Sequence, residues 1–139
     1  MIILAVDYGD VRTGLAVCDP TETLASPVCS ITQRDPARLA QEIAAVAAEH
    51  AAQLLVVGLP KNMDGSEGAR AEKCIAFATL LQELTGLPTQ LQDERLTTVS
   101  AHQALNQTNT RGKKRKAVID QVSAVMILQD YLDAKKHNL

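Results

Sequence analysis

Acidic residues at widely separated positions have the chemistry needed for a metal site. Asp7 follows an apolar run, and Asp120 lies within an apolar helical pattern. Asp93 and Glu94 end a short strand-like segment. Carboxylates among apolar neighbours are unfavourable unless they are paired or bound to a metal, and carboxylates that meet repel each other. Because neither His nor Cys accompanies them, we expect Mg²⁺ or Mn²⁺ rather than zinc.

This set of carboxylates favours phosphodiester hydrolysis. Two divalent ions about 4 Å apart can activate a water molecule and stabilise the leaving oxygen. We therefore predict a nuclease with Asp7, Glu94 and Asp120 as metal ligands and catalytic residues. Asp93 stays an alternative to Glu94, because neighbouring residues of a strand point to opposite faces. For Asp120 the alternative is a first-turn residue that only benefits from the helix dipole.

Basic residues precede Asp120 and flank the other acids. A charge run is usually a solvated connecting loop, but an acidic cleft still needs cations to attract a polyanion. Any one of these side chains can be an ordinary surface charge. The candidate phosphate-binding residues are Arg12, Lys61, Arg70, Arg95, Arg111, Lys113, Lys114, Arg115 and Lys116.

The elements that must position these groups follow from the apolar pattern. Residues 1–6 predict a strand buried on both faces that delivers Asp7 at its carboxyl end, where open α/β sheets bind ligands. Short turns then lead to strands at 13–18 and 26–32, which indicates an antiparallel meander. Asp35 and Pro36 begin a helix to about His50, and a strand at 53–57 is expected to pair in parallel with the first.

The second half of the chain also predicts helices alternating with a strand. Ser66 is a candidate N-cap for a helix that Gly86 and Pro88 end, and a strand follows at 89–92. Thr97 or Thr98 is expected to cap a helix through Leu105. The last helix should carry Asp120 about one turn from its start. Val118, Val122, Val125 and Leu132 should form one stripe, with Ile119, Met126 and Ile127 beside it. The predicted order is βββαβαβαα, a mixed five-stranded sheet of the α/β class, within one domain covering 1–139.

Composition narrows the class of protein. With 139 residues, 46% of them apolar, the chain can build one core. Its net charge of −2 restricts nucleic-acid contact to a local basic patch. Its only rings are Tyr8, Phe77 and Tyr131, which argues against a single-strand binder built on stacking platforms. The three cysteines lack CxxC spacing, and the N-terminus reads as neither signal peptide nor membrane span, so we expect a cytoplasmic protein.

Taken together, the motifs resemble those of the YqgF/RuvX family over essentially the whole chain. They are Asp7-Tyr8-Gly9 with Arg12 and Gly14, Gly58-Leu59-Pro60 with residues 62–66 and Gly68, residues 93–98, and Ile119-Asp120 with Ser123-Ala124 and residues 127–129. The resemblance implies a ribonuclease H-like fold, a bacterial cytoplasmic protein and the acidic triad Asp7, Glu94 and Asp120. It also implies a role in maturing the 5′ end of 16S rRNA in ribosomal precursor particles, beside an older proposal of Holliday-junction resolution. Gln121 and Ser123 stand where many RuvC-like resolvases have a second acid, which leaves one or two metals open.

Four functions are weighed on these grounds. The leading hypothesis is a Mg²⁺- or Mn²⁺-dependent nuclease acting on structured RNA. Resolution of four-way DNA would require a symmetric dimer, and both monomer and homodimer stay open. A non-catalytic adaptor for RNA or a transcription complex would keep the basic patch without the metal. An ATP-handling protein of the same fold is disfavoured, because the chain lacks a second lobe to close over a nucleotide.

Overall fold

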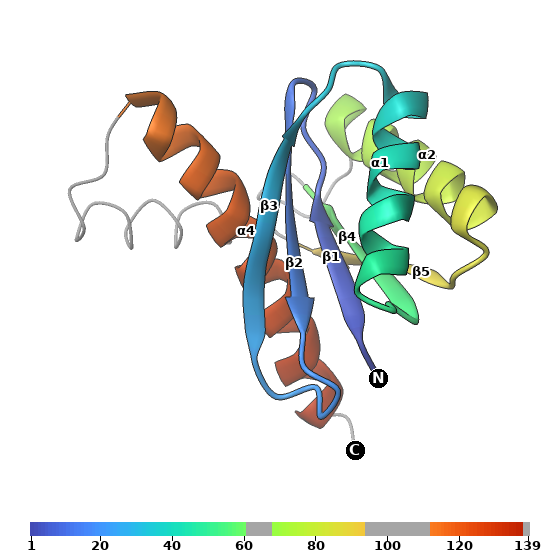
Figure 1. Ribbon diagram of the computed structural model, residues 1–139, viewed down its shortest axis with the longest axis vertical. Helices are drawn as coiled ribbons and strands as arrows, with labels where there is room; N and C mark the ends of the chain where they lie inside the picture. The colour runs from blue at the N-terminus through green and yellow to red at the C-terminus, as the bar shows by residue number, and fades with distance from the viewer. Residues whose placement is uncertain (61–67, 94–111, 138–139) are drawn as a thin grey trace.

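The structure is a computed structural model that describes residues 1–60, 68–93 and 112–137, with side chains from 120 to 136 in the last segment. Within these residues a mixed sheet of five strands has the order β3-β2-β1-β4-β5. Helices cover both of its faces (Figure 1). The strands are β1 (Ile3–Asp7), β2 (Arg12–Cys18), β3 (Ala25–Thr32), β4 (Leu54–Leu59) and β5 (Thr89–Asp93).

The strand pairing confirms the predicted meander and crossover. β1 pairs antiparallel with β2, which places Asp7 opposite Gly14, and β2 pairs antiparallel with β3. β4 lies parallel to β1, and β5 lies parallel to β4. The carboxyl ends of β1, β4 and β5 therefore open at the same edge of the sheet as Asp7.

Strand β1 is buried on both faces because it lies in the middle of the sheet. Leu4 and Val6 pack into the core beneath helices α1 (Pro36–Glu49) and α2 (Ala69–Thr85). Ile3 and Ala5 pack into a second core beneath helix α4 (Gly112–His137). This alternation directs the side chain of Asp7 to the α4 face, since it shares the parity of Ile3 and Ala5.

Helix α1 begins as the sequence predicted. The Asp35 side chain accepts a hydrogen bond of 3.1 Å from the backbone N–H of Ala37, and Pro36 occupies the first turn. Leu39, Ile43 and Ala47 form its buried face. The helix therefore packs against the sheet through an apolar stripe with helical spacing.

Helix α2 ends as predicted but begins later. Its N-cap is Gly68, not the predicted Ser66, and no side chain caps it. At its carboxyl end Gly86 adopts the left-handed conformation with φ of 71°, which glycine tolerates at no steric cost.

Helix α4 corrects two expectations. It begins at Gly112, so residues 112–116 of the basic run are helical rather than a connecting loop, and Asp120 lies about two turns from the start. The helix-dipole alternative for Asp120 therefore fails, because the dipole acts within the first turn.

The buried face of α4 also differs from the predicted stripe. Of the valines in that stripe, Val122 and Val125 are only partly buried, and the side chain of Val118 lies outside the described set. Leu132 is buried as predicted. Between residues 120 and 136, the buried side chains are Ser123, Ala124, Ile127, Leu128 and Leu132, so Ile127, predicted beside the stripe, is buried as well.

The helix predicted between Thr97 and Leu105 lies outside the described residues. None of the helices in the part of the chain that the structure describes combines the length and the apolar character that a membrane crossing requires.

Candidate active site

The end of β1 and the first half of α4 bring Asp7 and Asp120 together. Asp7 is paired in register with Gly14 of β2. A Cβ atom placed on Gly14 would lie 2.0 Å from the backbone carbonyl oxygen of Asp120. The helix backbone therefore rests directly on the strand beside Asp7, a contact that only glycine permits.

The proximity of the two carboxylates is visible in their electrostatics. The pKa of Asp7 is raised from 3.8 to about 7, mainly because burial disfavours the ionised form. The negative charge of Asp120 raises the pKa of Asp7 further, and the positive charge of Arg70 lowers it. Without a bound metal ion, Asp7 is therefore about half protonated near pH 7.

Arg12 partly neutralises Asp120. The Arg12 Nε atom donates a hydrogen bond of 3.1 Å to Asp120 Oδ2. Burial raises the pKa of Asp120, and the Arg12 guanidinium opposes that rise. Of the cations proposed from sequence, Arg12 is thus placed at the acidic pair.

The turn after β1 holds Asp7 in place. A Cβ atom on Gly9 would lie 1.9 Å from the carbonyl oxygen of Arg12, so the turn closes too tightly for a side chain there. The Gly9 backbone N–H donates to Thr13 Oγ1 at 3.2 Å, and Thr13 is fully buried. The glycine noted in the sequence therefore serves a close backbone approach.

Arg70 of α2 braces the same turn from the other side. It donates to Asp10 Oδ1 at 2.8 Å and to the backbone carbonyl of Tyr8. Its guanidinium carbon lies 5.1 Å from the centre of the Tyr8 ring. The sequence predicted Arg70 as a phosphate-binding residue, whereas in the structure it pairs with Asp10. No sequence pattern singled out Asp10, which lies in the turn between β1 and β2.

Asp93, the last residue of β5, lies on the face of the sheet that is covered by α1 and α2. Asp93 is in register with Leu59, which packs toward α1 and α2. Gln90, of opposite parity, accepts a hydrogen bond of 2.8 Å from Tyr131 Oη of α4. Asp93 therefore lies on the face away from Asp7, and Glu94 lies outside the described residues.

The remaining predicted basic residues are described incompletely. Lys61, Arg95 and Arg111 lie outside the described residues. The backbone of the segment from Lys113 to Lys116 belongs to the first turns of α4, and its side chains are not described.

The donor chemistry of the pair fits a divalent cation. No group of three potential metal-ligating side chains exists within the described ranges 1–60, 68–93 and 120–136. Asp7 and Asp120 nevertheless offer hard oxygen donors in a partly buried place. Burial raises the pKa of both carboxyl groups, so a bound cation would favour their ionised forms. Mg²⁺ or Mn²⁺ suits such a donor set.

Comparison with known proteins places the chain in a family. A family model described as "RuvX: Holliday junction resolvase" matches residues 1–134. The chain belongs to the RuvX family. This membership confirms the resemblance found in the motifs.

Relatives in the RuvX family match over nearly the whole chain. A Kineococcus radiotolerans protein named "Putative pre-16S rRNA nuclease" is 46% identical over 136 residues, covering 96% of this chain and 72% of that protein. An Acetivibrio thermocellus protein of the same name is 42% identical over 137 residues, covering 97% of both chains.

Solved structures share the fold. RuvC of Thermus thermophilus in complex with a Holliday-junction substrate has a TM-score of 0.62 at 11% identity, covering 99% of this chain and 96% of that one. The fowlpox virus resolvase with Holliday-junction DNA has a TM-score of 0.57 at 11% identity, covering 97% and 99%. These likenesses confirm the ribonuclease H-like α/β fold predicted for this member of the RuvX family.

Proposed function

We propose that this protein is a Mg²⁺- or Mn²⁺-dependent nuclease that hydrolyses phosphodiester bonds of structured RNA during 5′-end maturation of pre-16S rRNA. It would act as one nuclease domain over residues 1–139, on ribosomal precursor particles in the cytoplasm. The observation that carries the proposal is the approach of Asp120 to Asp7 across Gly14. The names of the RuvX relatives support pre-16S rRNA as the proposed substrate.

Asp7, Asp120 and Glu94 would hold the metal in this proposal. The face of Asp93, opposite to Asp7, supports Glu94 as the third carboxylate. A bound divalent ion would supply an activated water molecule and charge stabilisation for the leaving oxygen. Asp7 gives up its proton when positive charge arrives. Arg12 holds Asp120 in orientation from β2 and lies within reach of a phosphate there.

The first turns of α4 favour binding of a polyanion. Four basic residues occupy Lys113 to Lys116, at the helix end where the backbone dipole adds positive potential. Lys116 precedes Asp120 by four residues, about 6 Å along the helix axis. The basic run would therefore guide the phosphate backbone toward the acidic pair.

The decisive test is cleavage by an Asp7→Asn variant. The substrate is a precursor RNA carrying the 5′ region of 16S rRNA, with Mg²⁺ or Mn²⁺ present. We expect kcat to fall by more than about 100-fold, since even groups that only orient a metal ligand account for about 10- to 100-fold. Glu42→Gln, an exposed carboxylate of α1, is the matched control and should cleave normally. Wild-type rates in the Asp7 variant would overturn the proposal.

A second candidate is resolution of four-way DNA junctions. The description of the RuvX family model favours it. Two sites on opposite strands would require a symmetric dimer, so the mass in solution and the rate on a four-way junction relative to precursor RNA distinguish the two substrates.

A non-catalytic adaptor would bind RNA without binding Mn²⁺, and calorimetry with Mn²⁺ separates it from both nucleases.

A further inference from the structure

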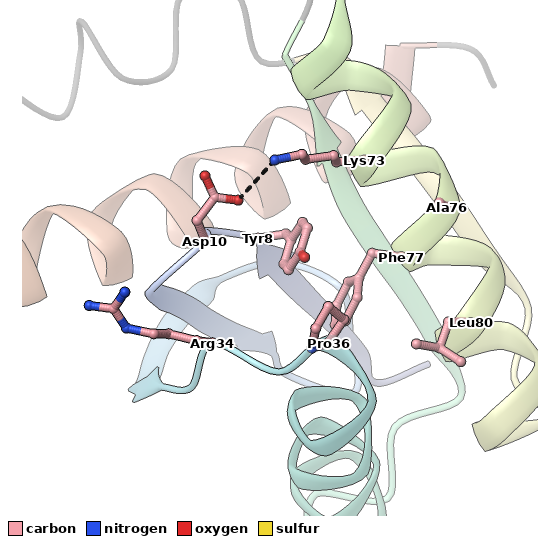
Figure 2. A pocket seen from close by; sticks show the side chains of 8 residues that line it. All are labelled: Tyr8, Asp10, Arg34, Pro36, Lys73, Ala76, Phe77 and Leu80. Atoms are coloured by element: carbon pink, nitrogen blue, oxygen red, sulfur yellow. Dashed lines mark ion pairs between the residues drawn. The ribbon is translucent and has the colours of Figure 1, made fainter.

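A pocket opens beside the acidic pair on the other face of β1. Tyr8 follows Asp7 directly, and its side chain turns toward α1 and α2, with the parity of Leu4 and Val6. The pocket has a volume of about 410 Å³ and lies between the turn after β1, the start of α1 and one side of α2 (Figure 2). This volume falls in the range of small-ligand sites. A nucleic-acid strand that crosses the edge of the sheet at Asp7 would therefore reach the pocket next.

The inner wall of the pocket is apolar and rigid. Phe77 stacks on the Tyr8 ring, with ring centres 4.1 Å apart and an angle of 4° between the rings. The Arg70 guanidinium also lies over the Tyr8 ring, 5.1 Å from its centre, so that the ring has two partners. Leu80 and Ala76 extend the apolar wall along α2 (Figure 2). Such a wall offers apolar van der Waals contact to a nucleobase.

The rim of the pocket carries more positive than negative charge. Arg34 and Lys73 contribute cations and Asp10 one carboxylate. Lys73 Nζ lies 3.8 Å from Asp10 Oδ1, a long ion pair between exposed side chains. Exposed pairs of this kind contribute little free energy, so Lys73 can turn to a phosphate at low cost. Apolar wall and cationic rim together match a nucleotide.

We propose that this pocket binds one unpaired nucleotide of the substrate strand, next to the phosphodiester that water would hydrolyse at Asp7 and Asp120. The inference rests on the proposed nuclease function and deepens it. A base stacked in a duplex cannot enter the pocket, whereas an unpaired base can. The substrate class is therefore a strand with an unpaired residue beside the cleaved bond.

Binding is tested first with the four nucleoside 5′-monophosphates as probes. Titration of the wild-type protein by NMR should shift the methyl resonances of Ala76 and Leu80. Ala76→Trp fills the pocket from an exposed position of α2 and should abolish these shifts at Leu80. Thr79→Trp, one turn further along the exposed side of α2 and outside the pocket lining, is the matched control. Lys73→Gln should weaken binding while leaving the melting temperature unchanged.

The second experiment places the nucleotide in the substrate. An RNA hairpin with an unpaired 5′ extension is compared with a fully paired duplex. Ala76→Trp should raise KM for the extended hairpin about tenfold, the scale of one lost base contact, with kcat nearly unchanged. The fully paired duplex should be a poor substrate, with the same residual rate in Ala76→Trp and Thr79→Trp, because a paired base does not enter the pocket. Thermal melting checks that both variants fold.

The outcomes separate this inference from the proposed nuclease function. Absence of shifts at Ala76 and Leu80, or equal KM values for the two tryptophan variants on the hairpin, would overturn the pocket assignment. Binding of monophosphates with an unaltered KM in Ala76→Trp would assign the pocket to a free nucleotide and overturn its role in the substrate strand. A wild-type protein that cleaves no nucleic acid contradicts the proposed function instead, while the NMR titration still reads out the pocket.

Discussion

Asp7 shows how one residue combines a structural cost with a chemical purpose. Asp7 is the last residue of a strand that is buried on both faces. Its carboxyl group lies near that of Asp120 from α4. Burial and like charge both disfavour ionisation, so the fold is strained electrostatically where the metal would bind. Arg12 relieves only the Asp120 side of the pair.

This strain predicts a pH-dependent stabilisation by Asp7→Asn in the metal-free protein. The pKa of Asp7 is about 7 in the folded state against 3.8 in the unfolded chain, so folding favours the protonated form. The wild type therefore loses stability as pH rises from about 4 to about 7, and the loss is complete above 7. The amide of Asp7→Asn does not ionise, so the variant should gain at most about 4 kcal/mol in free energy of unfolding over the wild type at high pH.

The measurement is the free energy of unfolding by denaturant at pH 4, 6 and 8 in the presence of a chelator. The gain from Asp7→Asn should be small at pH 4 and largest at pH 8. Glu42→Gln should give no pH-dependent gain. A gain for Asp7→Asn that does not change with pH would contradict the assigned desolvation of Asp7.

At the scale of elements, the site depends on how closely α4 lies against β2. The contact is between backbones. A Cβ atom added to Gly14 would lie 2.3 Å from the carbonyl carbon of Asp120 and 3.0 Å from the backbone nitrogen of Gln121. Backbone atoms of a packed helix cannot move aside as a flexible side chain does. Gly14 therefore sets the distance between Asp7 and Asp120.

Gly14→Ala should push α4 away from the sheet and separate the two carboxylates. We expect Mn²⁺ affinity and kcat to fall, the latter by about 100-fold, as misplacements near 1 Å do in other enzymes. Stability should fall by about 1 to 3 kcal/mol from overpacking. Gly86→Ala is the control, because its left-handed φ costs about 1 kcal/mol far from the site. Equal activity in the two alanine variants would refute this role of Gly14.

The face of Asp93 at the end of β5 predicts different roles for Asp93 and Glu94. Glu94→Gln should weaken Mn²⁺ binding and cleavage, because the proposal makes it a ligand. Asp93→Asn should leave both largely intact, because Asp93 lies on the α1 and α2 face. Calorimetry with Mn²⁺ on the two variants decides, and a loss confined to Asp93→Asn would reverse the assignment.

At the scale of the whole molecule, α4 is tied to the sheet at its far end. Lys135 Nζ lies 2.7 Å from Glu22 Oε1, and the Ala25 backbone N–H donates to Gln129 Oε1 at 3.4 Å. The other end of α4 carries Asp120 and the basic run, and its first turns extend past the sheet (Figure 1). A metal between Asp7 and Asp120 would tie this end of the helix to β1 as well.

Mn²⁺ should therefore raise the melting temperature of the wild-type protein. An ion that binds only the folded state at 100 times its Kd contributes about 2.7 kcal/mol, which corresponds to several degrees in a chain of this size. Asp7→Asn should show a much smaller rise with Mn²⁺, although it is more stable without metal at pH 8. Differential scanning fluorimetry across a Mn²⁺ series measures both, and an equal rise in the two proteins would show that the ion binds elsewhere.

Much of the fold could be predicted from the sequence because its signals are local. The Asp35-Pro36 cap, the left-handed Gly86 and the apolar run before Asp7 each specify their element through nearby residues. The parallel pairing of β1 and β4 followed from the length of the crossover. The start of α4 was missed, because a run of like charge gives no helical periodicity.

The sequence by itself determined which residue types the site would have, since a carboxylate after a buried strand and another on a packing face of a helix are visible in the pattern. Only the tertiary structure decided which of them meet. The contact of Asp120 with Gly14, the face of Asp93 and the bracing of Asp10 by Arg70 join segments that are distant in the chain. Hydropathy reports that a residue is buried, but its partner depends on how closely helix and sheet pack, and here the absence of one side chain sets that distance.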